Sequence, residues 1–255
     1  MATISENIQQ LHGRIERACL QASRAVDSVT LLVVTKTFPA PDVREAFEAG
    51  ERRFGENYVQ EGVDKIDALA DLRAGVEWHL IGPLQSNKTR VVAERFDWVH
   101  SVDRLKIAQR LSEQRPAGLA PLNVCLQVNI SGEDSKSGLA PAEVAEVARA
   151  VAALPNLRLR GLMAIPEPAD TLEAQRVPHR ALAALMAALN RDLGLSLDTL
   201  SMGMSADMDA AILEGATMVR VGSAIFGARS RPAVEPPGSA STSPSMPASG
   251  ARGQT

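Results

Sequence analysis

Eight short apolar segments recur along the chain, and a stretch with helical periodicity fills each gap between them. Strands separated by helices form parallel sheets, because a parallel connection must cross back over the sheet. Eight such units in 255 residues favour an α/β fold with a single closed (β/α)8 TIM-type barrel, and an open doubly wound sheet is the alternative. The predicted strands are 30–35, 51–54, 77–81, 97–101, 122–130, 158–164, 198–202 and 217–221.

The helical stretches include one more helix than a simple alternation needs. An amphipathic pattern at 4–25 precedes the first strand and predicts an extra N-terminal helix. The others are predicted at 41–49, 59–71, 86–94, 103–114, 141–153, 171–192 and 206–214. Beyond the last strand the chain becomes rich in Pro, Ser, Ala and Gly, which cannot bury enough area to offset the entropy of ordering. We therefore predict a barrel domain over 1–228 and a disordered tail over 229–255.

Composition excludes several classes of function. The net charge of −3 gives no sign of a general nucleic-acid or membrane surface. The four histidines lack the spacing of metal ligands, and the two cysteines form no framework. No stretch approaches the roughly 18 apolar residues of a membrane span, and no signal peptide is recognisable. These features predict a cytoplasmic protein that binds a small molecule, with no metal, no nucleic acid and no membrane.

The first strand ends beside a lysine, in the sequence "LLVVTKTFP". The strand is apolar at every position and should be buried on both faces, where an ammonium is costly. Only five of the 27 basic residues are lysines, so Lys36 is an uncommon choice at this position. In a barrel the C-terminal ends of the strands meet on one face, where active sites are built. Lys36 can therefore point into a shared polar mouth.

Other polar motifs also follow predicted strands. "FGENYVQE" places Asn57 after the second strand, where it is either a helix N-cap or a ligand contact. Ser205 likewise resembles a helix cap. "SMGMS" and "RVGSAIFG" follow or contain strands seven and eight, the usual phosphate site of barrels. There Ser201, Gly203, Gly222 and Ser223 would offer amides and hydroxyls, although the glycines could serve tight turns only.

A desolvated lysine and a phosphate site together suggest a particular ligand. A neutral amine attacks a carbonyl to form a Schiff base, and pyridoxal 5′-phosphate carries both an aldehyde and a phosphate. Lys36 would take the aldehyde, and the loops after strands seven and eight would take the phosphate. Arg220 lies one step deeper, where a cation near the ring nitrogen tunes this cofactor.

Eight motifs in order and spacing carry a resemblance that covers about residues 5–228. They are "VTKT", "FGENYVQE", "WHLIGPLQSNK", "HSVD", "SKSG", "GLMAIP", "SMGMSADMDAAI" and "VRVGSAIFG". The chain resembles the pyridoxal-phosphate homeostasis proteins, which are similar to the N-terminal barrel of alanine racemase. The resemblance implies the fold-type III class and an internal aldimine on Lys36. It also implies cofactor contacts from Asn57, Ser201, Gly222, Ser223 and Arg220, with Met202 and Ser205 near the site.

Three functions are compatible with these residues. The resemblance implies a non-enzymatic protein that holds pyridoxal phosphate for intracellular vitamin B6 balance, with apoenzymes as possible recipients. An amino-acid racemase is the alternative, but it needs a second base, and the single tyrosine, Tyr58, sits at a predicted helix start. Racemases of this type take that base from a C-terminal domain for which we expect no room, so we also expect a monomer. A Schiff-base aldolase would more often carry its lysine on strand six, which ends in "LMAIP".

Overall fold

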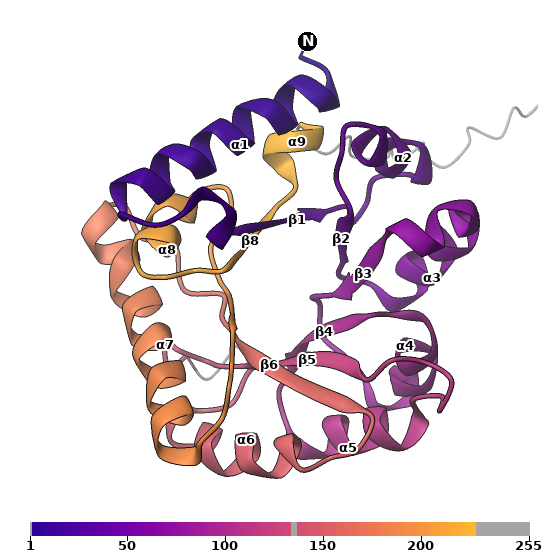
Figure 1. Cartoon of the computed structure of the whole chain (residues 1–255), viewed down its shortest axis with the longest axis vertical. Coiled ribbons are helices and arrows are strands. Elements are labelled where there is room, and N and C mark those ends of the chain that lie inside the picture. The colour runs from indigo at the N-terminus through magenta and orange to yellow at the C-terminus, as the bar shows by residue number, and fades with distance from the viewer. Residues whose placement is uncertain (1, 134–136, 228–255) are drawn as a thin grey trace, which may run out of the picture.

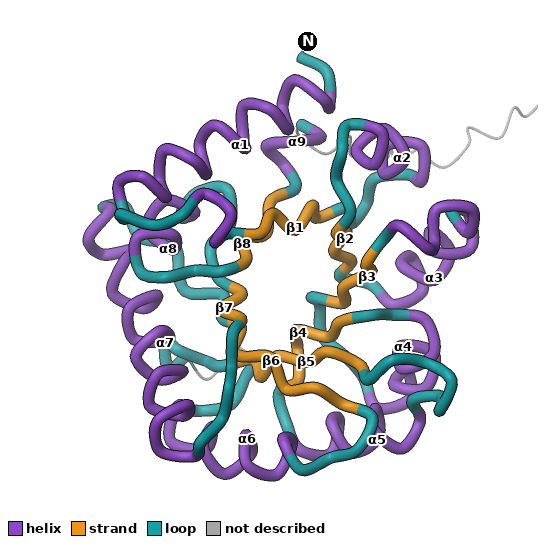
Figure 2. Tube along the Cα trace, in the orientation of Figure 1, coloured by secondary structure: helices purple, strands orange, loops and turns teal. Residues whose placement is uncertain are grey.

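A computed structural model describes residues 2–133 and 137–227 and confirms the predicted barrel. Eight parallel strands follow the chain order around a closed ring, and β1 pairs with β8 to complete it (Figures 1 and 2). The strands are β1 Thr30–Val34, β2 Arg53–Glu56, β3 Glu77–Leu80, β4 Trp98–Val102, β5 Leu122–Gln127, β6 Leu157–Met163, β7 Thr199–Ser201 and β8 Met218–Val221. The predicted tail lies outside the described residues.

Helices surround the ring, as Figure 1 shows. Short 3-10 turns precede or follow several of them, which accounts for predicted helices that are a few residues too long. The α-helices are α1 Ile4–Gln21, α2 Ala40–Glu48, α3 Val59–Ala68, α4 Thr89–Arg95, α5 Leu105–Gln114, α6 Val144–Ala152, α7 Leu172–Leu193, α8 Met208–Leu213 and α9 Ser223–Phe226. None of them in the described part of the chain is long and apolar enough to cross a membrane.

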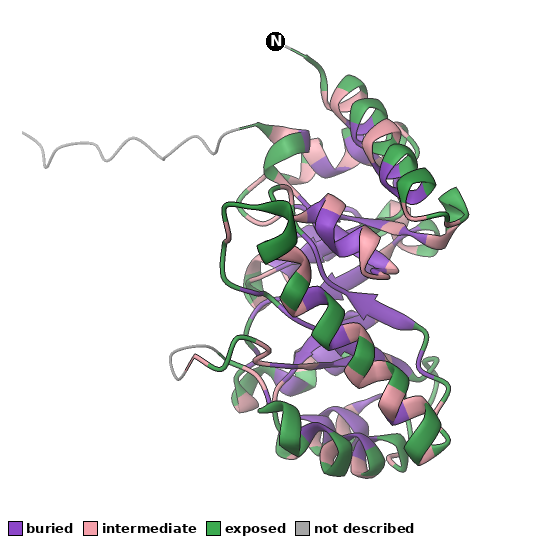
Figure 3. Cartoon of the chain, turned by 90° about the vertical axis from the view of Figure 1, so that its left-hand side faces the viewer, coloured by how far each residue is buried: buried purple, intermediate pink, exposed green. Residues whose placement is uncertain are grey.

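Most residues of the strands are buried (Figure 3). Side chains alternate along a strand, so that Leu31 and Val33 join the cluster under the helices while Leu32 and Val34 belong to a separate one. The second strand differs from its prediction, since it begins at Arg53 and continues through Glu56. The structure buries Glu56 at the end of this strand and pairs it with Lys65.

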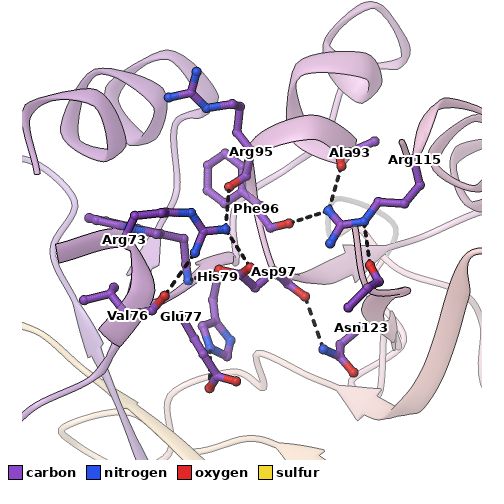
Figure 4. A network of polar contacts seen from close by, with 12 residues as sticks. Arg73, Val76, Glu77, His79, Ala93, Arg95, Phe96, Asp97, Arg115 and Asn123 are labelled. Carbon is purple, nitrogen blue, oxygen red and sulfur yellow. Dashed lines mark hydrogen bonds and ion pairs between the residues drawn. The ribbon is translucent and has the colours of Figure 1, made fainter. Parts of the chain in front are cut away.

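The N-terminal ends of β3, β4 and β5 are joined by a polar network, shown in Figure 4. Asp97, just before β4, accepts hydrogen bonds from Arg73 at 2.7 Å and from the amide of Trp78 at 2.8 Å. Its carbonyl accepts from the side chain of Asn123 at 3.3 Å. Polar residues therefore stabilise this end of the barrel, and the predicted motifs gather at the opposite end, where barrel active sites are usually built.

The extra N-terminal helix, α1, lies along the outside of the barrel against α8 and α9 (Figure 1). Thr3 and Glu6 form a capping box at its start. Its apolar side, with Ile8, Leu11 and Ile15, is buried in the main hydrophobic cluster. The helix is thus fixed both at its start and along its length, next to the segments that follow β7 and β8.

Candidate functional site

A cavity of about 150 Å³ opens where the C-terminal ends of β1, β2 and β8 meet. Its wall is apolar on several sides and carries two basic side chains. The lining residues are Val34, Lys36, Phe38, Asn57, Ile81, Ile165, Met204, Ser205, Arg220, Gly222 and Ser223. A second cavity of about 280 Å³ adjoins it, because Asn57, Ile81 and Ile165 line both.

Lys36 lies two residues beyond the end of β1 and is half-buried in the wall of this cavity. The next residue, Thr37, has a φ of 69°, a conformation that a β-branched residue adopts only under external restraint. That restraint comes from α3: Glu61 accepts the amide proton of Thr37, and Lys65 donates to the carbonyl of Thr35 at 2.6 Å. The backbone on both sides of Lys36 is therefore fixed.

The residues that fix this loop form a buried charged cluster. Lys65 Nζ lies 2.7 Å from a carboxylate oxygen of Glu56 and 2.7 Å from one of Glu61. Glu56 is fully buried, and burial raises the pKa of its carboxyl group above the ordinary value, while Lys65 beside it acts in the opposite direction. Such a cluster is stable only when every member stays paired. The loop that carries Lys36 thus depends on a lysine from another element.

Arg220 approaches the cavity from inside the barrel and is only 4% exposed. Its guanidinium donates to the carbonyl and the hydroxyl of Ser201 and to the carbonyl of Ala164, the latter two at 2.9 Å. Burial lowers the pKa of Arg220 to about 10. The group therefore remains a cation near neutral pH and can only donate hydrogen bonds.

A hydrogen-bonded chain runs from Arg220 into the barrel. His100 Nδ1 lies 2.8 Å from Ser201 Oγ, and His100 Nε2 lies 2.9 Å from His79 Nδ1. Burial, together with His79 and Arg220 nearby, lowers the pKa of His100 well below its ordinary value, so the ring is neutral. Arg220, Ser201, His100 and His79 are thus linked by consecutive hydrogen bonds. His79 is a buried, hydrogen-bonded residue of β3.

The position of Ser201 in this chain leads to a test with a matched control. Ser201→Ala removes a hydrogen-bond partner from both Arg220 and His100, which are buried, and should lower the free energy of unfolding by about 1–3 kcal/mol. Ser205→Ala alters a hydroxyl that lies on the cavity wall and should leave that free energy unchanged. Urea denaturation of the two variants measures the difference. Equal free energies of unfolding would show that the hydrogen bonds of the Ser201 hydroxyl do not stabilise the protein.

Two hydroxyl groups face each other at the mouth. Ser205 Oγ, from the loop after β7, lies 3.4 Å from Ser223 Oγ, at the start of α9. The first amides of a helix have no partner within it. Gly222 precedes them, and a Cβ there would stand 2.6 Å from the carbonyl oxygen of Val34. Only glycine fits at this position, so hydroxyls and amides form a cradle suited to an anion such as phosphate.

Asn57 has a polar atom without a partner. The prediction that it caps a helix is wrong, because α3 begins at Val59 after the N-cap residue Tyr58. The Oδ1 atom of Asn57 is buried and accepts no hydrogen bond within the described part of the chain. A buried acceptor left unpaired is costly, and this one lines both cavities. A ligand with a donor group could pair with it.

The structure brings together six of the nine site residues predicted from the sequence. These are Lys36, Asn57, Ser205, Arg220, Gly222 and Ser223. Ser201, Met202 and Gly203 do not line the cavity. Ser201 points into the barrel, Met202 is packed in the main hydrophobic cluster, and Gly203 has a φ of 90° and accepts the amide proton of Arg220 on its carbonyl oxygen. Ser205 is not a helix cap, since α8 starts at Met208 after Asp207. Ser205 thus occupies the place at the anion cradle that the sequence assigned to Ser201.

Most of the apolar wall of the cavity was not predicted from the sequence. Phe38, Ile81, Ile165 and Met204 line the cavity, and Met204 is 39% exposed although it is a large apolar residue. Ile81 lies just beyond a strand end, and Ile165 and Phe38 lie a few residues beyond one. The signal was therefore present, because residues just beyond a strand end in a barrel face the mouth.

The chain is similar to known proteins over most of its length. Residues 6–230 match the family model described as "Alanine racemase, N-terminal domain". The chain is 62% identical to the pyridoxal phosphate homeostasis protein of Pseudomonas aeruginosa and 56% identical to that of Escherichia coli K12. Each match covers 90% of this chain, and 97% and 98% of the two relatives.

Solved structures extend the comparison to the fold. PipY of Synechococcus elongatus with PLP bound is 38% identical, with a TM-score of 0.73 over 84% of this chain and 99% of that one. Alanine racemase from Corynebacterium glutamicum is 18% identical, with a TM-score of 0.64 over 91% of this chain and 62% of the racemase. The likeness to the racemase shows a shared fold alone.

Proposed function

The chain belongs to the alanine racemase N-terminal domain family, together with the pyridoxal phosphate homeostasis proteins, and from this we propose that it binds pyridoxal 5′-phosphate and serves its homeostasis. The observation that carries the proposal is that one cavity combines the Lys36 amine with an anion cradle. When bound, pyridoxal phosphate supplies an aldehyde that bonds to a primary amine, and a ring that withdraws electrons. The other residues of the cavity would orient the bound cofactor.

The residues present fit this cofactor group by group. Lys36 would hold the aldehyde end. Ser205, Ser223 and the amides after Gly222 would hold the phosphate, because they are hydrogen-bond donors gathered around one space. The unpaired Oδ1 of Asn57 would accept a hydrogen bond from the ring hydroxyl. Phe38, Ile81 and Ile165 would pack against the ring and exclude water from the covalent bond.

Arg220 would face the ring nitrogen as a permanent donor. A guanidinium cannot accept a proton, so it would keep that nitrogen unprotonated and restrain the ring from withdrawing electrons. Three hydrogen bonds, to Ser201 and Ala164, hold the group in place. This arrangement favours holding the cofactor over using it, which supports a role without turnover.

The set of side chains around the cavity also supports a non-catalytic role. Racemisation needs one base on each face of the substrate carbon. Among the described residues that line the two adjoining cavities, Lys36 and Arg220 are the titratable ones, and arginine is no base. Tyr58 is 59% exposed and lines neither cavity. A second base is thus lacking in this part of the chain.

Spectroscopy of the purified protein tests the proposal. Addition of pyridoxal phosphate should produce a yellow absorption band that borohydride abolishes, and peptide mapping should then locate the reduced cofactor on Lys36. A racemisation assay with several amino acids should show no turnover above the background of free cofactor. A colourless protein would contradict the proposed ligand, and turnover that depends on Lys36 would favour the racemase instead. Delivery to apoenzymes, a monomeric state and a cytoplasmic location remain predictions from the resemblance.

A further inference from the structure

We propose that α1 braces the phosphate cradle from outside the barrel, with Asn7 and Arg14 as positioning residues that hold its two sides together. The inference rests on the proposed binding of pyridoxal phosphate. Neither residue lines the cavity, so neither is expected to touch the ligand. Their effect would pass through Ser205 and Ser223, which they hold from behind.

Arg14 holds the side of the cradle that follows β7. Its Nη1 donates to the carbonyl oxygen of Ser205 at 2.8 Å. The same guanidinium donates to both carboxylate oxygens of Asp209, at 2.9 and 3.2 Å. A bidentate pair fixes the plane of the guanidinium. Arg14 therefore sets the position and the orientation of the peptide unit that carries the Ser205 hydroxyl.

Asn7 holds the other side. Its Nδ2 donates to the carbonyl oxygen of Ile225 at 2.7 Å. Ile225 belongs to α9, which begins at Ser223 and has only one turn. So short a helix is not stable by its own hydrogen bonds. The contact with Asn7 and the burial of Ile225 in the main hydrophobic cluster keep it in place.

The two contacts come from one rigid element. Asn7 and Arg14 are seven residues apart and so lie on the same side of the helix, about two turns from each other. Ile8, Leu11 and Ile15 anchor that side in the core. Figure 1 shows α1 lying across α8 and α9. A fixed span on α1 thus sets the gap between the loop after β7 and the start of α9.

The gap matters because the cradle binds through directional contacts. The two hydroxyls lie 3.4 Å apart, and hydrogen bonds weaken steeply as distance and angle depart from their optimum. Among the lining residues of the cavity, Lys36 and Arg220 are the cations, and both are engaged by other parts of the cofactor in our proposal. Phosphate affinity therefore depends on neutral donors whose spacing must be kept.

The loop after β7 has a second support that keeps it folded without Arg14. Asp207 accepts a hydrogen bond from the amide of Met204 at 2.7 Å, and its other oxygen lies 2.9 Å from Nε2 of the buried His179. Removal of Arg14 should therefore displace the loop slightly and not unfold it. This makes a selective effect on ligand binding measurable.

The experiment compares pyridoxal phosphate with pyridoxal, which has the aldehyde and the ring but no phosphate. Arg14→Met removes the hydrogen bonds and keeps the aliphatic stem, and Arg17→Met is the control, since Arg17 is exposed on the same helix. Equilibrium titration of the absorption band gives both affinities. We expect Arg14→Met to weaken the binding of pyridoxal phosphate by about tenfold, because a displaced Ser205 would lose about one charge-assisted hydrogen bond to the phosphate. The binding of pyridoxal should be unchanged. Arg17→Met should change neither.

The outcomes separate this inference from the proposed function. If wild-type protein fails to bind pyridoxal phosphate, the proposed function fails. If the wild-type protein binds but Arg14→Met weakens the binding of both ligands equally, α1 supports only the fold and the inference is overturned. The inference is also overturned if Arg14→Met changes the binding of neither ligand. Asn7→Ala provides a second variant that should reproduce the selective loss, and thermal unfolding of the unliganded proteins shows that each variant is folded.

Discussion

Replacement of Lys36 by alanine is expected to abolish covalent attachment of pyridoxal phosphate and to leave only weak, reversible binding. The amine is the sole group in the lining that can bond to an aldehyde, because Arg220 stays protonated. The cradle at Ser205, Ser223 and Gly222 is unchanged in this variant and still offers its donors to the phosphate. Borohydride treatment followed by mass spectrometry should find no labelled peptide, while equilibrium dialysis should still detect bound cofactor.

A matched control separates this effect from general loss of a lysine. Lys106 is exposed on α5 and lines neither cavity at the mouth. Lys106→Ala should therefore keep full covalent attachment. If Lys36→Ala lost all affinity for pyridoxal phosphate, including reversible binding, the cradle would not bind the phosphate independently of Lys36. If label remained on Lys36→Ala, another lysine would be the attachment site.

Lys65→Met should destabilise the protein by about 3–5 kcal/mol, the usual cost of leaving a buried charge without its partner. Lys65 is 6% exposed and forms ion pairs with both Glu56 and Glu61. Methionine keeps the length of the side chain and removes the ammonium, so packing changes little. The loop at Thr35 and Thr37 would also lose its support, and covalent attachment at Lys36 should slow. Urea denaturation and the rate of appearance of the absorption band measure the two effects.

The loss of stability in Lys65→Met should depend on pH in a definite direction. Burial already raises the pKa of Glu56, and loss of Lys65 raises it further. A carboxyl whose pKa is higher in the folded state than in the unfolded one lowers stability as pH rises above its unfolded value. The deficit should therefore shrink as pH falls toward the ordinary range of glutamate. Adding Glu56→Gln should recover part of the stability near neutral pH; no recovery would mean that Glu56 is not the unpaired group.

The fold could be predicted because its signal is local. Each βα unit can be recognised from an apolar run that is followed by a stretch with helical periodicity. A chain with eight such units is compatible with only a few sheet topologies. Boundaries were less accurate where a distant partner decides them. The second strand continues through Glu56 only because Lys65, on the next helix, pairs with its carboxylate. No local pattern around residue 56 contains that information.

The site was predictable in part for the same reason. Lys36, Gly222 and Ser223 stand out by their place after strands, and the structure lines one cavity with them. "SMGMS" contains two serines, and the sequence could not tell which one lines the cavity. The end of β7 decides this, since Ser201 is its last residue and faces the inside of the barrel, where His100 binds it. The register of β7 therefore determines which serine lines the cavity, and register could not be predicted from the sequence.

The ring closes between β1 and β8, where Leu32 lies opposite Arg220. Lys36 and the proposed phosphate donor Ser223 stand on the two sides of this seam, although one belongs to the beginning of the fold and the other to its end. A chain emerging from the ribosome therefore has no complete pocket until its last strand has been made and has docked beside the first. Pyridoxal phosphate would then bind only the folded protein. It would stabilise the closed barrel and would not assist the folding steps that close it.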